Sequence, residues 1–187
     1  MFEIASLLLE VIAGLLAGMC LLRMYMQYQR IPMSARSGNP MGNFIFATTD
    51  WLVLPLRKGL PAIGRLDTAS LVGAYLIELI RFLLLWLMAG MAGSPIPILV
   101  YTLFAVAQMC IYGLTIMVIV YAVLSWVQTQ SPAADLLERL VMPVLIPIRR
   151  VLPLVGGVDL SPLVLLVLLQ ILGILLGKVQ ATILMLL

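Results

Sequence analysis

Apolar residues in this chain gather into four long stretches, separated by segments in which polar residues and prolines recur. A helix of about 20 apolar residues crosses the hydrocarbon core of a bilayer. We therefore predict membrane spans at about 4–26, 69–89, 98–126 and 161–178. The third is longer than a crossing requires, which predicts a tilted or partly interfacial helix. Near the end of the first stretch, Arg23 begins a basic and aromatic edge typical of a membrane interface.

Two shorter segments, at about 40–54 and 132–146, mix apolar and polar residues instead. In the second segment, leucine and valine recur at helical spacing, with charged residues on the opposite face. Each segment follows a helix-start signal, Asn39-Pro40 or Ser131-Pro132, because an N-cap residue before a proline favours a helix. We predict an interfacial amphipathic helix in each segment.

Prolines predict where these two interfacial helices stop. A proline inside a helix removes one backbone hydrogen bond and clashes with the preceding turn. Pro55 therefore predicts the end of the first interfacial helix, and Pro143 and Pro147 predict a kink or an end in the second.

The chain repeats itself at an offset of 92 residues, which places Pro147 opposite Pro55. Pro55-Leu-Arg-Lys-Gly-Leu-Pro61 matches Pro147-Ile-Arg-Arg-Val-Leu-Pro153, and the further matches are Gly64 with Gly156 and Asp67 with Asp159. Self-similarity at a fixed offset indicates a duplicated unit. We predict a first repeat at 1–92 and a second at 93–187, each built as span, interfacial helix, proline-arginine turn and span. An even number of spans separates the two turns, so the repeats are parallel.

Composition indicates that the solvent of this protein is a bilayer. Hydrophobic residues make up 64% of the chain and charged residues 10%, whereas soluble domains are about half apolar and about a quarter charged. The chain has no histidine, the commonest general base and metal ligand. Cys20 and Cys110 are isolated, which argues against a disulfide or zinc site. We therefore predict no enzyme activity, no catalytic residue, no metal and no cofactor.

The distribution of basic residues predicts the orientation in the membrane. The loops at 27–68 and 127–160 hold arginine and lysine, whereas the connection at 90–97 holds neither. The positive-inside rule places loops rich in these residues in the cytoplasm. Both long loops are then cytoplasmic, and both termini lie on the opposite face.

The second turn carries the pattern that resembles a known family. It runs from Pro147 through Arg149-Arg150 to Gly156-Gly-Val-Asp-Leu-Ser-Pro162, and Ser125-Trp126 precedes it. This pattern resembles the YggT family, whose double-repeat proteobacterial form is similar to nearly the whole chain. The first copy departs from it, with Gln27-Tyr28 opposite Ser125-Trp126 and Ser70 opposite Pro162.

The resemblance implies a multi-pass protein of the bacterial inner membrane, in which the positive-inside rule makes both termini periplasmic. Family members have no agreed biochemical activity, and no catalytic residues carry over. Bacterial relatives are associated with cell division, membrane organisation or osmotic and ion homeostasis. Plastid relatives are associated with haem attachment to cytochrome b6 and with nucleoid distribution.

The two basic pairs, Arg57-Lys58 and Arg149-Arg150, are the first candidate sites. Each basic residue near an anionic membrane surface gains about 1 kcal/mol of attraction. The pairs are therefore candidates for binding anionic lipid head groups or an acidic partner. Plain topological anchoring is the alternative, although it does not need the prolines and glycines that fix these turns.

Asp67 and Asp159 directly precede the second span of each repeat, where an aspartate side chain commonly caps a helix. We predict this capping role for both. The two G-x-x-x-G runs, Gly14–Gly18 and Gly173–Gly177, allow helices to approach closely. We favour packing within the chain for these runs, and a homo-oligomer is the alternative.

Glu10, Glu78 and Arg81 form a candidate charge cluster inside the membrane. An ionisable residue at the centre of a span costs about 2.5–3.5 kcal/mol, so it normally has a partner. Glu78 and Arg81 share a helical face, and Glu10 lies at a similar depth in the first span. We predict that Arg81 is held between both carboxylates as a structural lock; an ion or proton path is the alternative. In the second repeat, Gln170 stands opposite Glu78 and Gly173 opposite Arg81.

Together these features predict a non-enzymatic organising or assembly factor of the inner membrane, acting through its two cytoplasmic turns. The expected partners are the lipid bilayer and another membrane protein, and no nucleic acid is expected. The alternative is a small transporter or channel component in osmotic or ion homeostasis.

Overall fold

The structure is a computed structural model that describes residues 2–34, 39, 41–91, 94–127, 131–152 and 159–186. Six helices form the regular structure of these ranges: α1 Phe2–Tyr28, α2 Gly42–Gly59, α3 Thr68–Met88, α4 Ile96–Val127, α5 Pro132–Arg149 and α6 Ser161–Met185. Four of them, α1, α3, α4 and α6, are long and apolar enough to cross a membrane. The predicted all-α integral membrane fold is therefore confirmed, and the chain is a multi-pass membrane protein.

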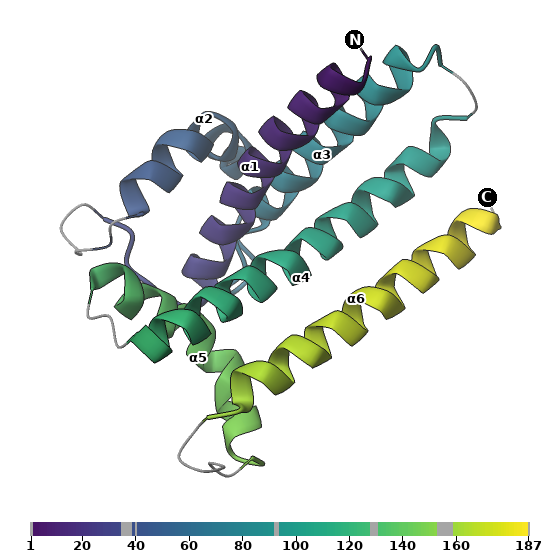
Figure 1. Ribbon diagram of the computed structural model, residues 1–187. Coiled ribbons are helices and arrows are strands. Elements are labelled where there is room, and N and C mark those ends of the chain that lie inside the picture. The colour runs from purple at the N-terminus through teal and green to yellow at the C-terminus, as the bar shows by residue number, and fades with distance from the viewer. Residues whose placement is uncertain are drawn as a thin grey trace.

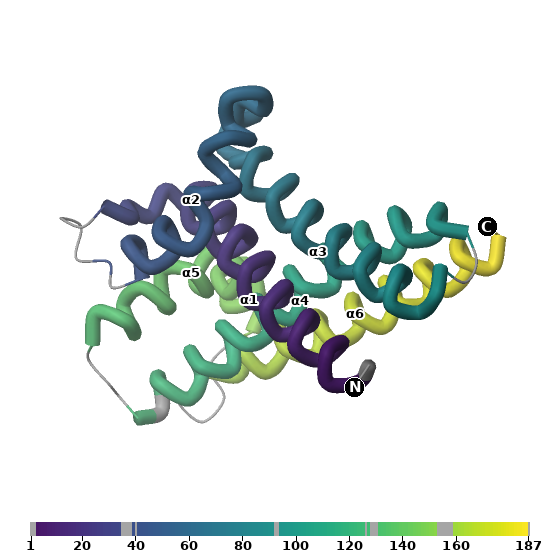
Figure 2. The backbone as a smooth tube through the Cα atoms, turned by 90° about the horizontal axis from the view of Figure 1, so that it is seen from above, coloured from purple at the N-terminus to yellow at the C-terminus, as the bar shows by residue number. Residues whose placement is uncertain are grey.

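The first three helices correspond in order and type to the last three. In Figure 1, both chain ends, the end of α3 and the start of α4 lie at one end of the bundle, and α2 and α5 lie at the other. Figure 2 shows α2 and α5 near each other, at the end away from the C-terminus. Both turns that follow these short helices are thus at the same end, as parallel repeats require.

Small residues let α1 and α3 pack closely. Ala13 and Ala17 of α1 are buried in one cluster with Ala69, Ala74 and Ile77 of α3. In the other half, a cluster of larger aliphatic side chains joins α4, α5 and α6, and its buried members are Val118, Val141, Leu145, Leu165 and Leu169.

A third cluster joins the two halves at the end where α2 and α5 lie. Met26 and Ile45 from the first half are buried there with Leu136 and Leu140 from α5. The Tyr25 hydroxyl donates a hydrogen bond to the Leu140 carbonyl oxygen at 2.7 Å. This cluster adds to the packing of α4 against α3 and α1, which also joins the two halves.

Both short helices extend further than the sequence predicted. The helix predicted at 40–54 continues through Pro55 to Gly59, and the one predicted at 132–146 continues through Pro143 and Pro147 to Arg149. All three prolines are exposed, so the carbonyl groups that lose their helical donor are not trapped in the core. Burial of the opposite helix face outweighs the one hydrogen bond lost at each proline.

The helix-start signals had different outcomes. Ser131 is the N-cap of α5, and its hydroxyl accepts a hydrogen bond from the Ala134 N–H at 3.1 Å, as predicted. The first short helix begins later, at Gly42, and Asn39 accepts a hydrogen bond from the Met41 N–H instead. A Cβ at Gly42 would stand 2.2 Å from the Met33 carbonyl oxygen, so only glycine fits there. Pro40 lies outside the described residues.

Three further predictions are corrected or left open. Nothing stands within 4 Å of a Cβ built at Gly14 or Gly18, because Ala13 and Ala17 provide the close packing against α3. The fourth span, predicted to end near 178, continues as helix to Met185. The matched turn residues Pro153 and Gly156 lie outside the described residues.

Candidate functional site

Each half of the molecule holds one arginine–aspartate ion pair in the same place. Arg57 Nη2 lies 2.6 Å from Asp67 Oδ2, and Arg149 Nη2 lies 2.6 Å from Asp159 Oδ2. In both halves the arginine belongs to the last turn of the short helix, and the aspartate precedes the next span. The ion pair therefore closes the turn between these two helices.

Each arginine also contacts the first span of its own half. Arg57 Nη2 donates a hydrogen bond to Gln27 Oε1 at 3.1 Å, and Arg149 Nη2 donates one to the Tyr121 hydroxyl at 3.0 Å. One guanidinium thus joins three elements in each repeat, because its planar fork offers several donors at once. The acceptors differ between the halves, but the arrangement is the same.

The role predicted for Asp67 is corrected, and that of Asp159 is extended. Asp67 is the N-cap of α3, yet its side chain makes no cap hydrogen bond to the backbone. Its Oδ2 accepts from Arg57 and from the Ser70 hydroxyl at 2.5 Å instead. Asp159 Oδ1 does accept from the Ser161 N–H at 2.9 Å, while its Oδ2 binds Arg149. The charged partner ten residues earlier thus replaces the cap at Asp67, whereas at Asp159 the cap and the ion pair use different oxygens.

These contacts control the ionisation of both aspartates. Burial opposes ionisation of Asp67, but the hydrogen bonds from Arg57 and Ser70 and the attraction of the arginine outweigh it and lower its pKa. For Asp159, burial is likewise outweighed by hydrogen bonds from Ser161 and Arg149, so its pKa is also lowered. Both turns therefore hold their aspartate in the charged form.

The second cation of each basic pair does not pair with the aspartate of its turn. Lys58 and Arg150 are both exposed, and neither forms an ion pair with any residue that the structure describes. Each follows directly after an arginine that is fixed by its aspartate. The four predicted basic residues thus divide into two that close the turns and two that face outward.

The predicted charge cluster forms only in part. Arg81 Nη2 lies 2.8 Å from Glu78 Oε2, and the guanidinium stacks over the Phe82 ring at 4.3 Å from its centroid. Glu78 is 1% exposed, whereas Glu10 is exposed and makes no ion pair with Arg81. Among the described residues, Arg81 therefore pairs with Glu78 alone, and the predicted bridge from Glu10 is absent.

A buried arginine was not expected from the sequence. Arg23, predicted to lie at the membrane interface, is 1% exposed. Its Nη1 donates hydrogen bonds to Thr49 Oγ1 at 2.7 Å and to Asp50 Oδ1 at 2.6 Å, tying α1 to α2. A signal was available, since Asp50 is the only acidic residue between Glu10 and Asp67.

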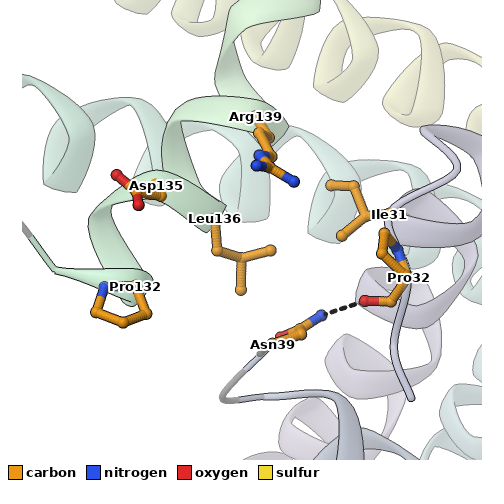
Figure 3. Close-up of a pocket in the computed structure, with 7 residues that line it drawn as sticks. All are labelled: Ile31, Pro32, Asn39, Pro132, Asp135, Leu136 and Arg139. Atoms are coloured by element: carbon orange, nitrogen blue, oxygen red, sulfur yellow. Dashed lines mark hydrogen bonds between the residues drawn. The ribbon is translucent and has the colours of Figure 1, made fainter. Parts of the chain in front are cut away.

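A small pocket of about 170 Å³ lies between the two halves, and it is lined by Ile31, Pro32, Asn39, Pro132, Asp135, Leu136 and Arg139. Figure 3 shows the Asn39 amide donating to the Pro32 carbonyl oxygen, and Asp135 turned away from Arg139. Small-molecule sites usually enclose about 300–1,000 Å³, so this pocket is too small for a typical organic ligand. Among the described residues, no group of three or more acidic or cysteine side chains gathers to hold a metal ion.

Comparison with known proteins gives a consistent result over the whole chain. A family model described as CCB3/YggT matches residues 2–88 and 100–180, one segment in each predicted repeat. The chain is 35% identical over 181 residues to the uncharacterized protein YggT of Escherichia coli K12, covering 95% of this chain and 92% of that protein. It is 32% identical over 177 residues to an uncharacterized protein of Vibrio alginolyticus, covering 93% and 94%. No solved structure matches the chain.

Proposed function

The chain belongs to the CCB3/YggT family, and from this premise we propose that it is a non-enzymatic organising or assembly factor of the bacterial inner membrane. It acts through its two arginine–aspartate turns, which face the cytoplasm. One observation carries the proposal: the same ion pair closes the turn in both halves and leaves one exposed cation directly beside it.

Plain anchoring does not explain this construction. The positive-inside rule depends on the number of basic residues near span ends, and it requires no particular geometry. Here Arg57 and Arg149 are each tied to an aspartate and to the first span of the half. These ion pairs and hydrogen bonds fix the backbone at the next residue, Lys58 or Arg150. Less conformational entropy is therefore lost when that residue binds a partner.

Two such cations at one end of the molecule make a bivalent surface. Binding at one turn raises the effective concentration for the other, so two weak contacts can add to one stable contact. Lysine and arginine beside a bilayer favour anionic head groups and acidic protein segments. The surface therefore suits a membrane protein partner that presents acidic residues at the lipid surface.

Co-purification tests this role. The full chain is extracted from its own membranes in a mild detergent, as wild type, as the Lys58→Ala/Arg150→Ala double variant, and as Lys178→Ala. Lys178 is the matched control, because it is an exposed cation in α6, far along the chain from either turn. We expect a membrane protein to co-purify with wild type and the control but not with the double variant. A partner retained by the double variant, or none with any form, contradicts the proposal.

A rival function rests on Glu78, a carboxylate that is 1% exposed within a membrane-spanning helix and is paired with Arg81. Buried charges of this kind occur in ion and proton pathways. Flux into liposomes containing the purified chain separates the two functions. Saturable flux that is lost in Glu78→Gln would replace the organising role with a transport role. Flux equal to that of empty liposomes supports the organising role.

A further inference from the structure

A groove of about 490 Å³ lies between α4 and α6, and we call it the amide groove. Its polar side chains are Gln108, Tyr112 and Thr115 of α4 and Gln170 of α6, and the rest of its lining is apolar or glycine. The three α4 residues recur at helical spacing, so they share one face. Gln170 lies nine residues after the start of α6 at Ser161, which is about 14 Å along the helix and near the middle of the span.

The amide groove occupies the place that the charge pair occupies in the first half. The offset of 92 residues places Gln170 opposite Glu78 and Gly173 opposite Arg81. Aligning Gln27-Tyr28 with Ser125-Trp126, at the ends of the first spans, places Gln108 opposite Glu10. All three charged positions of the first half are therefore neutral in the second.

The missing side chain at Gly173 leaves room for the Gln108 amide. A Cβ there would stand 3.2 Å from Gln108 Nε2, so the amide lies close to the α6 backbone where the first half has an arginine. One turn further, nothing stands within 4 Å of a Cβ built at Gly177. A neighbouring helix can therefore come close to α6 at this point, since small residues permit close approach of helix backbones.

Gln108 and Gln170 of the amide groove have no hydrogen-bond partner among the described residues, and the same is true of the Tyr112 hydroxyl. The Thr115 hydroxyl is satisfied, because it donates to the Ile111 carbonyl oxygen at 2.8 Å. The carboxamides of Gln108 and Gln170 form no hydrogen bond with any described residue, and Gln170 is exposed. At mid-bilayer depth no water is present to satisfy them, and an unmatched polar group in hydrocarbon is unfavourable.

We propose that the amide groove is the site at which a second copy of this chain binds within the membrane. Copies inserted the same way are related by a two-fold axis along the membrane normal, which brings identical residues together at equal depth. A carboxamide has both a donor and an acceptor, so Gln170 can pair with Gln170 of the second copy.

Cysteine cross-linking in native membranes tests the interface. In the full chain carrying Cys20→Ser and Cys110→Ser, Gln170→Cys is compared with Leu15→Cys. Leu15 is the matched control, because it is 61% exposed and lies at the middle of α1, which predicts a lipid-facing position at similar depth. Mild oxidation should give a covalent dimer for Gln170→Cys and only background for Leu15→Cys. Equal cross-linking of the two variants overturns the proposal.

Energy transfer between labelled copies measures the contribution of the amide. The chain is reconstituted into vesicles of phosphatidylethanolamine and phosphatidylglycerol at several protein-to-lipid ratios. Gln170→Leu should weaken dimerisation about three- to twentyfold, as expected for the loss of an interhelical hydrogen bond in a membrane. Leu15→Ala should leave it unchanged. Unchanged dimerisation in Gln170→Leu, or a monomeric chain that holds a lipid in the groove, overturns the proposal. Because Gln170 is exposed, its replacement by leucine should not disturb folding.

Discussion

Asp67 is the residue on which the first turn depends most. It is 2% exposed, and one of its oxygens accepts from both Arg57 and Ser70. A buried carboxylate is tolerated only while its charge is compensated. Arg57 compensates this charge, whereas Lys58, the next residue, forms no ion pair with any described residue. Mutations of Arg57 and Lys58 should therefore affect stability differently, although both residues are cations.

Arg57→Ala should destabilise the folded protein by about 1–3 kcal/mol, because it leaves Asp67 buried without its charged partner. This loss of stability is smaller than the loss on breaking a fully buried ion pair, since the Arg57 side chain is 38% exposed and solvent screens its charge. Lys58→Ala should stay within about 0.5 kcal/mol of wild type. Chemical unfolding in detergent measures both, and equal effects for the two variants would show that the ion pair does not fix the turn.

Stability should fall in acid because of the same aspartates. The folded state lowers the pKa of Asp67 and Asp159, so their contribution is complete above the ordinary aspartate value of about 3.9 and is lost as the pH falls through the lowered value. Asp67→Asn/Asp159→Asn should be less stable at neutral pH and depend less steeply on pH below about 4. Thermal unfolding in detergent from neutral pH into acid checks this. Parallel curves for the two proteins would contradict it.

The intramembrane pair gives a third prediction. Arg81→Ala should cost about 3–5 kcal/mol, because Glu78 would be left charged and buried. Adding Glu78→Gln should recover most of this loss, whereas adding Glu10→Gln should recover only a small part, since Glu10 does not pair with Arg81 and only adds a like charge near Glu78. Thermal stability and protein level in membranes report the effect. A fully stable Arg81→Ala protein with an osmotic phenotype in cells would favour the ion-path role of this cluster.

The sequence identified the individual residues of the turns, but it did not predict which residues they pair with. The repeat by itself indicates Arg57, Asp67 and their counterparts Arg149 and Asp159, since these residues match at the offset of 92. Their pairing was not evident, because a cap requires only local spacing, whereas an ion pair ten residues apart depends on how the intervening turn folds. The burial of Arg23 was missed for the same reason, since its partner Asp50 lies on another helix.

The short helices α2 and α5 show how packing overrides a local signal. Each contains proline, yet each continues beyond it to present its basic pair. Buried residues on one face, such as Val53 in α2 and Leu145 in α5, hold these helices against the spans. Periodicity predicted that the helices exist, but their ends depended on burial that the sequence alone does not display.

The outer face of α2 carries a fourth prediction. Phe44, Trp51 and Leu54 are 56%, 60% and 49% exposed, although all three are apolar. An amphipathic helix buries such a face about 5–10 Å into the boundary between head groups and acyl chains. With Trp86→Phe and Trp126→Phe, Trp51 emission should be blue-shifted in vesicles. Lipids brominated near the head group should quench it more than lipids brominated near the chain ends. Water-like emission that no brominated lipid quenches would contradict an interfacial α2.

The whole molecule is a four-span bundle in which both arginine–aspartate turns lie at one end, with the chain ends at the other (Figure 1). The long apolar stretches and the even number of spans between the turns were enough to predict this arrangement. The cluster of Met26, Ile45, Leu136 and Leu140 that joins the halves was not predictable, because it depends on α2 and α5 lying near each other.

A cytoplasmic location of both turns is the condition on which the organising role depends, and cysteine accessibility tests it most directly. Single cysteines are placed at Ser34, Ala133 and Ser94, three exposed positions, in the full chain carrying Cys20→Ser and Cys110→Ser. In intact spheroplasts, an impermeant thiol reagent should label the cysteine at position 94 and leave those at 34 and 133 unlabelled until the membrane is opened. Labelling at 34 and 133 with protection at 94 would reverse the orientation and contradict a cytoplasmic role for the turns.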